Sequence, residues 1–270
     1  MQHSSKAKDR GTFHAGVGAC ARPNACRRLR LDRQKEIKRI KKMEKRRKMG
    51  ELKRALWIGS LEEPSEFQRK LRLGYGIVSA QLMQENLMKG LEETSGLVFD
   101  SISASIVSPF PAYPEAWIEE TIWQHRAGAS DVSVPFLNLT WGNRLFAGWS
   151  LLRAAKKWRD QGREEDPAVL YVYSMRSGPM AAGLWLKRHL RQAKLILIVT
   201  DLPGFMDPEA GRIKKLLKKM DFVWISRMLP AFDGYVLFSS RMAEALNLPD
   251  GKWIRMEGCY AENRVQRKAG

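Results

Sequence analysis

The 270-residue chain has little cysteine, little histidine and no long apolar run. Its three cysteines are Cys20, Cys26 and Cys259, and no second Cys or His pair follows the first two at the spacing of a zinc site. No stretch reaches the roughly 18 apolar residues that cross a bilayer. The basic N-terminus also lacks the apolar segment of a secretory signal. We therefore predict no metal site and a cytoplasmic protein with reduced thiols.

Common nucleotide-binding and nucleophile motifs are also missing. The first apolar run ends in Gly59-Ser60, which matches neither the GxGxxG fingerprint nor the P-loop, so dinucleotide or ATP binding is unsupported. His125 and His189 are isolated, and no Ser/His/Asp or Cys/His order indicates a catalytic triad. The sequence therefore predicts no cofactor.

Acidic residues are scarce only at the N-terminus. Residues 1–54 hold 19 Lys and Arg against 5 Asp and Glu, whereas the remaining 216 residues hold 28 against 24. Most of the formal net charge of +18 therefore belongs to the N-terminal segment, and the rest of the chain is close to neutral. The overall basicity does not indicate a nucleic-acid-binding domain, and nucleic acid is not a predicted partner of the folded part.

Short apolar runs alternate with amphipathic segments along the rest of the chain. The expected strands are 55–60, 97–107, 132–140, 168–174, 194–200, 234–239 and 252–257, and the expected helices are 66–93, 141–161, 180–191, 207–224 and 240–246. This alternation predicts an α/β fold, a Rossmann-like parallel sheet with helices on both faces. We expect a basic disordered or partly helical extension at 1–53, the α/β domain at 54–258 and a linker at 259–270.

The first candidate site residues follow expected strands, because parallel sheets bind ligands where their strands end. A glycine at position 59 allows a phosphate or sugar to approach the backbone, and the helix after Ser60 offers free N–H groups. A tight turn is the alternative. Asp201 follows the strand 194–200, where a carboxylate can act as a base or hold sugar hydroxyls. Helix capping or a turn is the alternative for Asp201.

Further candidates lie at the ends of the last two expected strands. Ser240 is expected to cap the helix that it begins. Arg241 could contact a phosphate, or it could pair with Glu244 three residues later. Glu257 could hydrogen-bond a ligand, and a buried pair with Arg255 or another basic residue is the alternative.

One expected helix is basic on one side and apolar on the other. Lys214, Lys215, Lys218 and Lys219 stand opposite Ile213, Leu216, Leu217 and Met220. Such a helix could lie on an anionic membrane surface, with the basic N-terminal segment adding to the attraction. The protein would then be peripheral at the inner face of the membrane. The alternative is a surface helix whose apolar stripe packs on the sheet.

Four segments together carry a resemblance to a known family. They are Ala55–Ser60, Ile198–Pro203, Asp233–Met242 and Glu257–Gly258. Over about residues 54–260 the chain resembles the N-terminal domain of bacterial GT-B glycosyltransferases of the family 4 (glycosyltransferase group 1) type. The resemblance implies transfer of a sugar from a nucleotide-sugar to a saccharide or lipid-linked acceptor, in polysaccharide or glycoconjugate synthesis. The reaction takes place between two Rossmann-like domains, of which the first mainly binds the acceptor.

The resemblance also implies a second domain, which in this family binds most of the nucleotide-sugar and carries a paired-Glu motif. The chain contains no such domain, so we expect a sequence truncated before its donor-binding half. The acceptor cleft is predicted to contain Asp201 as the catalytic group and Gly59, Ser60, Ser240, Arg241 and Glu257 as binding residues. Two alternatives are a non-catalytic subunit or remnant that pairs with a separate donor-binding subunit, and a nucleic-acid-associated α/β domain that uses the basic N-terminal arm.

Overall fold

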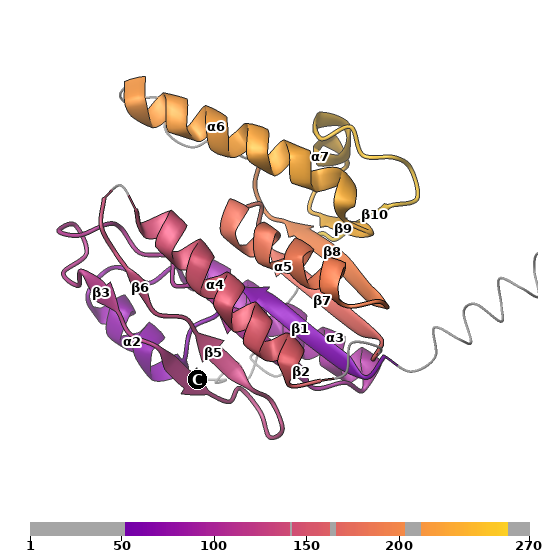
Figure 1. Cartoon of the computed structure of the whole chain (residues 1–270), viewed down its shortest axis with the longest axis horizontal. Helices are drawn as coiled ribbons and strands as arrows, with labels where there is room; N and C mark the ends of the chain where they lie inside the picture. The colour runs from indigo at the N-terminus through magenta and orange to yellow at the C-terminus, as the bar shows by residue number, and fades with distance from the viewer. Residues whose placement is uncertain (1–51, 141, 163–165, 203–211, 259–270) are drawn as a thin grey trace, which may run out of the picture. The chain divides into compact units, whose positions relative to one another are not determined.

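A computed structural model of the chain describes residues 52–140, 142–162, 166–202 and 212–258 (Figure 1). The chain divides into two units, 1–50 and 51–270, and every described residue belongs to the second. The elements in chain order are β1 (Arg54–Gly59), α2 (Pro64–Arg72), α3 (Val78–Ser95), β2 (Phe99–Ser103), β3 (Trp117–Ile118), β4 (Thr121–Trp123), β5 (Asp131–Ser133), β6 (Phe136–Leu137), α4 (Asn143–Asp160), β7 (Ala168–Tyr173), α5 (Ser177–His189), β8 (Ala193–Val199), α6 (Arg212–Met228), η1 (Leu229–Ala231), β9 (Gly234–Leu237), α7 (Ser240–Ala245) and β10 (Trp253–Arg255). The predicted extension, apart from its last two residues, and the predicted linker lie outside the described residues.

Eight of the strands form one sheet in the order β10-β9-β8-β7-β1-β2-β5-β4. Neighbouring strands are parallel throughout, except that β4 runs antiparallel to β5. The chain starts in the middle of the sheet at β1, adds β2 and β5 on one side, and crosses to β7 on the other side. The predicted Rossmann-like α/β fold is confirmed.

Different helices cover the two faces of the sheet. Leu56 and Ile58 of β1 belong to a core that includes residues of α4, α5 and α6, whereas Ala55 and Trp57 belong to a second core that includes Met88 of α3. Because side chains of a strand alternate between the faces, a strand covered on both sides needs apolar residues at every position. This requirement explains the continuous apolar run of β1. Figure 1 shows α4 and α5 lying along one face of the sheet.

The single helix expected at 66–93 is two helices, so this prediction was wrong. α2 ends at Arg72, α3 begins at Val78, and Gly74 between them has a φ of 82°. Positive φ is readily adopted only by glycine, so Gly74 ends the first helix although apolar residues continue at helical spacing beyond it. The break places the start of α3 beside the chain that leaves β1, where Gln81 hydrogen-bonds the backbone of Glu62.

The strand expected at 132–140 is divided. β5 stays in the large sheet, whereas β6 pairs with β3 in a separate two-stranded antiparallel sheet. Pro135 lies between β5 and β6, and proline cannot donate a backbone hydrogen bond to a strand ladder. The sequence pattern did not indicate β3 or β4, which are two and three residues long.

Candidate functional site

The candidate site lies where the order of the strands reverses. β1 has β2 on one side and β7 on the other, and the chain extends the sheet in opposite directions from these two strands. In open α/β sheets ligands bind outside the carboxyl ends of the strands at such a point. Ser60 follows β1 there, and Ser174 follows β7. Ser174 has a φ of 70°, which is uncommon for a residue other than glycine and is found preferentially at functional sites.

The amide of Gln84 on α3 holds Ser60. The Gln84 Oε1 atom accepts a hydrogen bond from the Ser60 backbone N–H at 3.0 Å and one from Trp57 Nε1 at 3.2 Å. The Gln84 Nε2 atom donates to the Ser60 hydroxyl at 3.1 Å. Gln84 is completely buried, so these bonds fix the end of β1 in one conformation. The predicted site residue Ser60 is therefore a rigid part of the sheet edge.

Packing explains the glycine at position 59. A Cβ atom added to Gly59 would collide with Gln84 Oε1 and would lie 2.8 Å from Trp57 Nε1. Glycine is thus required so that the amide of Gln84 can reach the end of β1. The approach of a ligand to the backbone at Gly59 stays a prediction.

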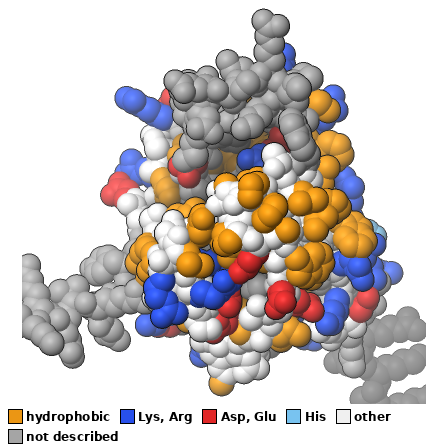
Figure 2. Space-filling view, turned by 90° about the vertical axis from the view of Figure 1, so that its left-hand side faces the viewer, with side chains coloured by type: hydrophobic (Ala, Val, Ile, Leu, Met, Phe, Trp, Pro, Cys, Tyr) orange, Lys and Arg blue, Asp and Glu red, His pale blue; other side chains and the backbone are white. Residues whose placement is uncertain are grey.

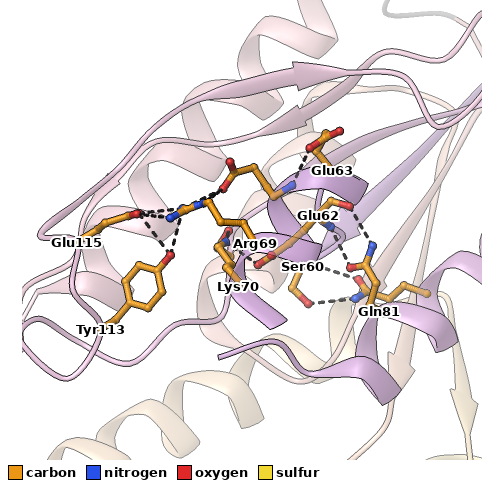
Figure 3. Close-up of polar contacts among 11 residues, drawn as sticks. Ser60, Glu62, Glu63, Arg69, Lys70, Gln81, Tyr113 and Glu115 are labelled. Carbon is orange, nitrogen blue, oxygen red and sulfur yellow. Dashed lines mark hydrogen bonds and ion pairs between the residues drawn. The ribbon is translucent and has the colours of Figure 1, made fainter. Parts of the chain in front are cut away.

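A buried ion pair follows Ser60 in the connection to α2 (Figure 3). The Glu62 Oε1 atom lies 3.0 Å from Lys70 Nζ, and the two side chains are 10% and 6% exposed. Lys70 Nζ also donates to the Ser105 hydroxyl at 2.8 Å. The second carboxylate oxygen, Glu62 Oε2, is buried without a hydrogen-bond partner among the described residues. This pair was not predicted from the sequence, because charged side chains are usually exposed and are seldom buried unless they are paired.

A second glutamine on α3 holds the backbone of Glu62. The Gln81 Oε1 atom accepts from the Glu62 N–H at 3.1 Å, and Gln81 Nε2 donates to the Glu62 carbonyl at 2.9 Å. Figure 3 shows this amide facing the connection between β1 and α2. Gln81 and Gln84 are three residues apart, so both lie on the buried side of α3.

A recess opens between this connection and the start of α3. Its cavity volume is about 20 Å³, which is room for about one water molecule. Its lining consists of Ser60, Glu62, Phe67, Tyr75, Gly76, Ile77, Ala80, Gln81 and Ile106. The recess combines aromatic and apolar walls with a carboxylate, an amide and a hydroxyl, as binding sites for small polar molecules do. We call it the β1 recess.

A surface network lies beside the buried pair. The guanidinium of Arg69 donates to both oxygens of Glu115, at 2.6 and 3.3 Å, and to Glu66 at 3.0 Å. The hydrogen bond from Arg69 lowers the pKa of the Glu115 carboxyl below its ordinary value. Burial, followed by the charge of Glu115, raises the pKa of Tyr113. This network joins α2 to the loop before β3, and it leaves Arg69 and Glu115 more than one-third exposed.

An arginine, Arg176, lies between the end of β7 and the start of α5. Arg176 precedes α5, and its backbone N–H donates to the carbonyl of Ser174 at 3.0 Å. Burial, and then the positive charge of Arg144, lowers the pKa of Arg176 to about 10, whereas Asp221 acts in the opposite direction. Two arginines near the sheet edge can attract an anionic group, because guanidinium groups match phosphate and carboxylate oxygens. Arg176 was not among the residues predicted from sequence.

The other predicted residues follow β8, β9 and β10. Asp201 is exposed just after β8, and Ser240 and Arg241 are exposed at the start of α7. The prediction that Ser240 caps α7 was wrong: the cap is Ser239, whose hydroxyl accepts from the Arg241 N–H at 3.2 Å. Ser240 and Arg241 are therefore the first helical residues, with their side chains at the surface.

Glu257 follows β10 and pairs with Arg255, whose guanidinium lies 2.8 Å from the carboxylate. The side chains of Arg255 and Glu257 are 55% and 77% exposed, so the expected pair exists but is not buried. Because β8, β9 and β10 are parallel neighbours, Asp201, Ser240 and Glu257 share one edge of the sheet. Ser60 belongs to the same edge, with β7 between β1 and β8.

His125 lies in a different cluster, near the amino ends of β2 and β5. Its Nδ1 atom is 2.7 Å from Asp131 Oδ2, and its Nε2 atom is 3.1 Å from Glu92 Oε1. Burial lowers the pKa of His125, but the hydrogen bonds and charges of Asp131 and Glu92 outweigh it, so the pKa is raised. Parallel sheets bind ligands at the opposite edge, so this cluster is a structural one.

The predictions about metal binding and about the membrane concern residues that the structure describes only in part. Within the described ranges no group of three or more His, Cys, Asp or Glu side chains could hold a metal ion, and no helix is long and apolar enough to cross a membrane. Lys214, Lys215 and Lys218 are among the residues of α6 whose side chains are not described. The predicted contact of this helix with an anionic membrane stays a prediction.

No protein family and no curated protein matches the sequence. The chain is similar to a sucrose-phosphate synthase structure from Thermosynechococcus elongatus, with a TM-score of 0.44, 10% identity, and coverage of 77% of this chain and 91% of that chain. It is similar to an alpha,alpha-trehalose 6-phosphate synthase from Burkholderia multivorans, with a TM-score of 0.38, 13% identity, and coverage of 73% and 42%. It is also similar to a UDP-forming alpha,alpha-trehalose-phosphate synthase from Burkholderia vietnamiensis, with a TM-score of 0.39, 12% identity, and coverage of 72% of this chain and 43% of that chain. The chain thus spans less than half of the two trehalose-phosphate synthases, and likenesses at this level carry no argument for function.

Proposed function

We propose that residues 54–258 are the acceptor-side domain of a GT-B glycosyltransferase of the family 4 type. The reaction is transfer of a sugar from a nucleotide-sugar to a saccharide or lipid-linked acceptor. The observation that carries the proposal is the reversal of strand order at β1, where Ser60 borders a polar recess. Ser60, Asp201, Ser240 and Glu257, which belong to the segments that carry the resemblance to this family, lie at the same edge of the sheet.

Each side chain at the edge has a chemical role in this proposal. Asp201 is the candidate general base, because an exposed carboxylate at a strand end can accept the proton of an attacking acceptor hydroxyl. Ser60, Ser240 and Glu257 supply hydrogen bonds to acceptor hydroxyls. Arg241 and Arg176 supply positive charge for a phosphate of the donor or of a lipid-linked acceptor.

The nucleotide part of the donor is assigned to a second domain, on the same polypeptide or on a partner. This chain should therefore bind a free nucleoside diphosphate weakly, with a Kd above about 1 mM. A lower Kd would require more than about 4 kcal/mol of binding free energy from half a site.

The test is a binding measurement with the full chain. The fluorescently labelled protein is applied to an array of bacterial saccharides, and UDP is titrated separately by calorimetry. We expect saccharide binding, and we expect Asp201→Asn to weaken it by about tenfold or more, the effect of losing one charge-assisted hydrogen bond. Asp160→Asn is the matched control, because Asp160 lies at the far end of α4 and pairs with Arg159.

The outcomes separate the functional classes. Submillimolar binding of UDP without saccharide binding would overturn the acceptor-side assignment. Binding of DNA or RNA that weakens steeply with salt, and that needs residues 1–53 alone, would support the nucleic-acid hypothesis instead.

An exposed apolar surface favours a second candidate function, a subunit that pairs with a separate donor-binding protein. Leu145 and Trp149 on α4 are 77% and 59% exposed, and Trp224 on α6 is 62% exposed. The ion pair between Arg144 and Asp221, at 3.7 Å, joins the two helices. Figure 2 views the side on which α4 begins and shows hydrophobic side chains gathered among charged ones. Exposed apolar surfaces of this kind mark interaction sites.

The subunit hypothesis predicts association through α4. Leu145→Glu should abolish co-purification of the tagged chain with a donor-binding protein from its native cell, while leaving saccharide binding unchanged. Lys156→Glu, a charge change elsewhere on α4, is the control. A chain that purifies alone and shows the saccharide binding described above would contradict the subunit hypothesis.

A further inference from the structure

Arg176 is a cation without a bonded partner at the carboxyl edge of the sheet. Its guanidinium makes no hydrogen bond or ion pair with the described residues, and its nitrogen atoms are not among the fully buried ones, so a ligand can reach them. A half-buried charge without an acceptor is costly. We propose that Arg176 and Arg144 bind the phosphate group of a phosphorylated acceptor. That the phosphate belongs to an acceptor rests on the function proposed above, whereas the anion site does not.

A second arginine, Arg144 on α4, acts on Arg176. Burial, and then the positive charge of Arg144, lowers the pKa of Arg176 to about 10. Asp221 on α6 lies 3.7 Å from Arg144, and its carboxylate acts on Arg176 in the opposite direction. Two guanidinium groups beside one carboxylate leave an excess of positive charge. A bound anion would remove the repulsion between the two arginines.

The backbone adds hydrogen-bond donors at the same place. α5 begins at Ser177, and it has neither a side-chain cap nor an acidic residue in its first turn. No acceptor for the N–H groups of Ser177 and Gly178 is found among the described residues. Free N–H groups at the start of a helix carry partial positive charge and bind phosphate. The start of α4 likewise has no side-chain cap and no acidic residue.

A contact between two glycines brings the starts of α4 and α5 together. A Cβ atom added to Gly178 would lie 3.1 Å from the Cα atom of Gly148, so the two backbones touch there. Arg144 precedes Gly148 by about one helical turn, and Arg176 is the residue before α5 begins. Figure 1 shows the two helices side by side on one face of the sheet. A larger residue at either glycine would push the helices, and with them the arginines, apart.

Charge and position select the ligand. A phosphate monoester carries about two negative charges near pH 7 and three acceptor oxygens, which suit two guanidinium groups and free N–H donors. A carboxylate carries a single charge and a neutral sugar carries none, so either would balance the cluster less well. Ser174, whose φ is 70°, lies between the end of β7 and this site. Strained residues of this kind are found preferentially at ligand sites, so Ser174 is placed to contact the sugar that carries the phosphate.

The experiment is a titration of the ¹⁵N-labelled full chain, followed by NMR at matched ionic strength. Glucose 6-phosphate is the probe, and glucose and inorganic phosphate are compared with it. We expect glucose 6-phosphate and phosphate, but not glucose, to shift the amide signals of Ser177 and Gly178. Arg176→Gln should weaken the binding of glucose 6-phosphate by about tenfold or more, the effect of losing a charge-assisted hydrogen bond. Arg153→Gln, at an exposed arginine of α4 that stacks on Trp149, should leave the affinity unchanged.

A variant with increased affinity covers the case in which Arg176→Gln does not fold. Asp221→Asn removes the opposing carboxylate, so it should strengthen the binding of glucose 6-phosphate by about threefold or more. An unchanged or weaker affinity of the folded Asp221→Asn variant would overturn the site. Equal amide shifts with potassium chloride alone would also overturn it, because they would show a general effect of salt.

Further ligands identify the molecule that carries the phosphate. Phosphatidylcholine vesicles that contain phosphatidic acid present the same group on a lipid, and binding tighter than that of glucose 6-phosphate would support the site and identify a lipid-linked acceptor. Tighter binding of UDP than of either, with the same amide shifts, would overturn the acceptor assignment together with the proposed function. Glucose-induced shifts at Asp201 without phosphate-induced shifts at Ser177 would overturn the site and leave the proposed function standing. Phosphate-induced shifts in a chain that binds no saccharide would support the anion site and overturn the proposed function.

Discussion

Buried carboxylates lie at both ends of the strands, and their surroundings differ. At the carboxyl end of β1, Glu62 pairs with Lys70 and lines a recess. At the amino ends of β2 and β5, Glu92 and Asp131 enclose His125, and Asp131 is completely buried. The two clusters contain similar groups, and Glu62 of the first one lines the β1 recess.

The contacts of the carboxylates explain the difference. Glu92 Oε1 accepts from the backbone N–H of Phe99, the first residue of β2, at 2.8 Å, and Asp131 Oδ2 accepts from that of His125, just after β4, at 2.6 Å. Near Glu62 the amides of Gln81 and Gln84 hold the backbone instead. Each cluster keeps one buried carboxylate oxygen without a hydrogen-bond partner among the described residues, Glu62 Oε2 in the first and Asp131 Oδ1 in the second.

The largest expected effect concerns the pair at the carboxyl end. Lys70→Met leaves the Glu62 carboxylate buried without its cation and should lower the free energy of unfolding by about 3–5 kcal/mol. The double variant with Glu62→Gln removes both charges and should recover much of this loss. Urea denaturation measures both values. A cost below about 1 kcal/mol for the single variant would mean that the pair behaves like an exposed one.

A methyl group at the end of β1 should have the next largest effect. Gly59→Ala forces a Cβ against Gln84 and Trp57 and should cost about 1–3 kcal/mol of unfolding free energy. Gly90→Ala is the matched control, because Gly90 is an exposed residue of α3 with open space around it, and alanine should stabilise the helix by up to about 1 kcal/mol. Equal effects of the two substitutions in urea denaturation would contradict the packing described for Gly59.

A smaller effect, dependent on pH, is expected from the cluster at the amino end. The folded state raises the pKa of His125 above the unfolded value of about 6.5, so protonation of His125 favours folding. This stabilisation is fully present below about pH 6.5 and is lost as the pH rises through the raised folded pKa. His125→Gln should flatten the fall in unfolding free energy above pH 6.5, measured by urea denaturation at several pH values. Identical slopes for the two proteins would show that His125 does not titrate differently on folding.

The smallest expected effect comes from the surface network beside the β1 recess. Arg69 and Glu115 are 38% and 37% exposed, and solvent screens exposed ion pairs. Glu115→Gln should therefore change the free energy of unfolding by less than about 1 kcal/mol. A loss as large as that of Lys70→Met would show that the network supports the buried pair and is not a surface feature.

Sequence predicted the fold better than it predicted the site. The apolar runs of β1, β7 and β8 are long and continuous, because strands in the middle of a covered parallel sheet need apolar residues on both faces. The two- and three-residue strands β3 and β4 are too short to show a period. The break in the helix expected at 66–93 depended on Gly74, whose conformation overrides the spacing of the apolar residues around it.

The site was found only in part. Ser60 was predicted from its place after β1, but Glu62 and Lys70 looked like ordinary surface charges. A signal was present in Gln81 and Gln84, two amides three residues apart in a segment with apolar residues at helical spacing, which indicates buried polar partners.

The sequence by itself determined the alternation of strands and helices, the parallel sheet and the neutral character of its folded part, because periodicity and composition are local properties of the chain. Only the tertiary structure decided the order of the strands, the crossing from β2 and β5 back to β7, and the approach of α3 to the end of β1. These features depend on contacts between residues far apart in the chain, such as Gln84 with Ser60 and Lys70 with Ser105. Burial of a charge likewise depends on what folds over it, so the free oxygen of Glu62 became visible only in three dimensions.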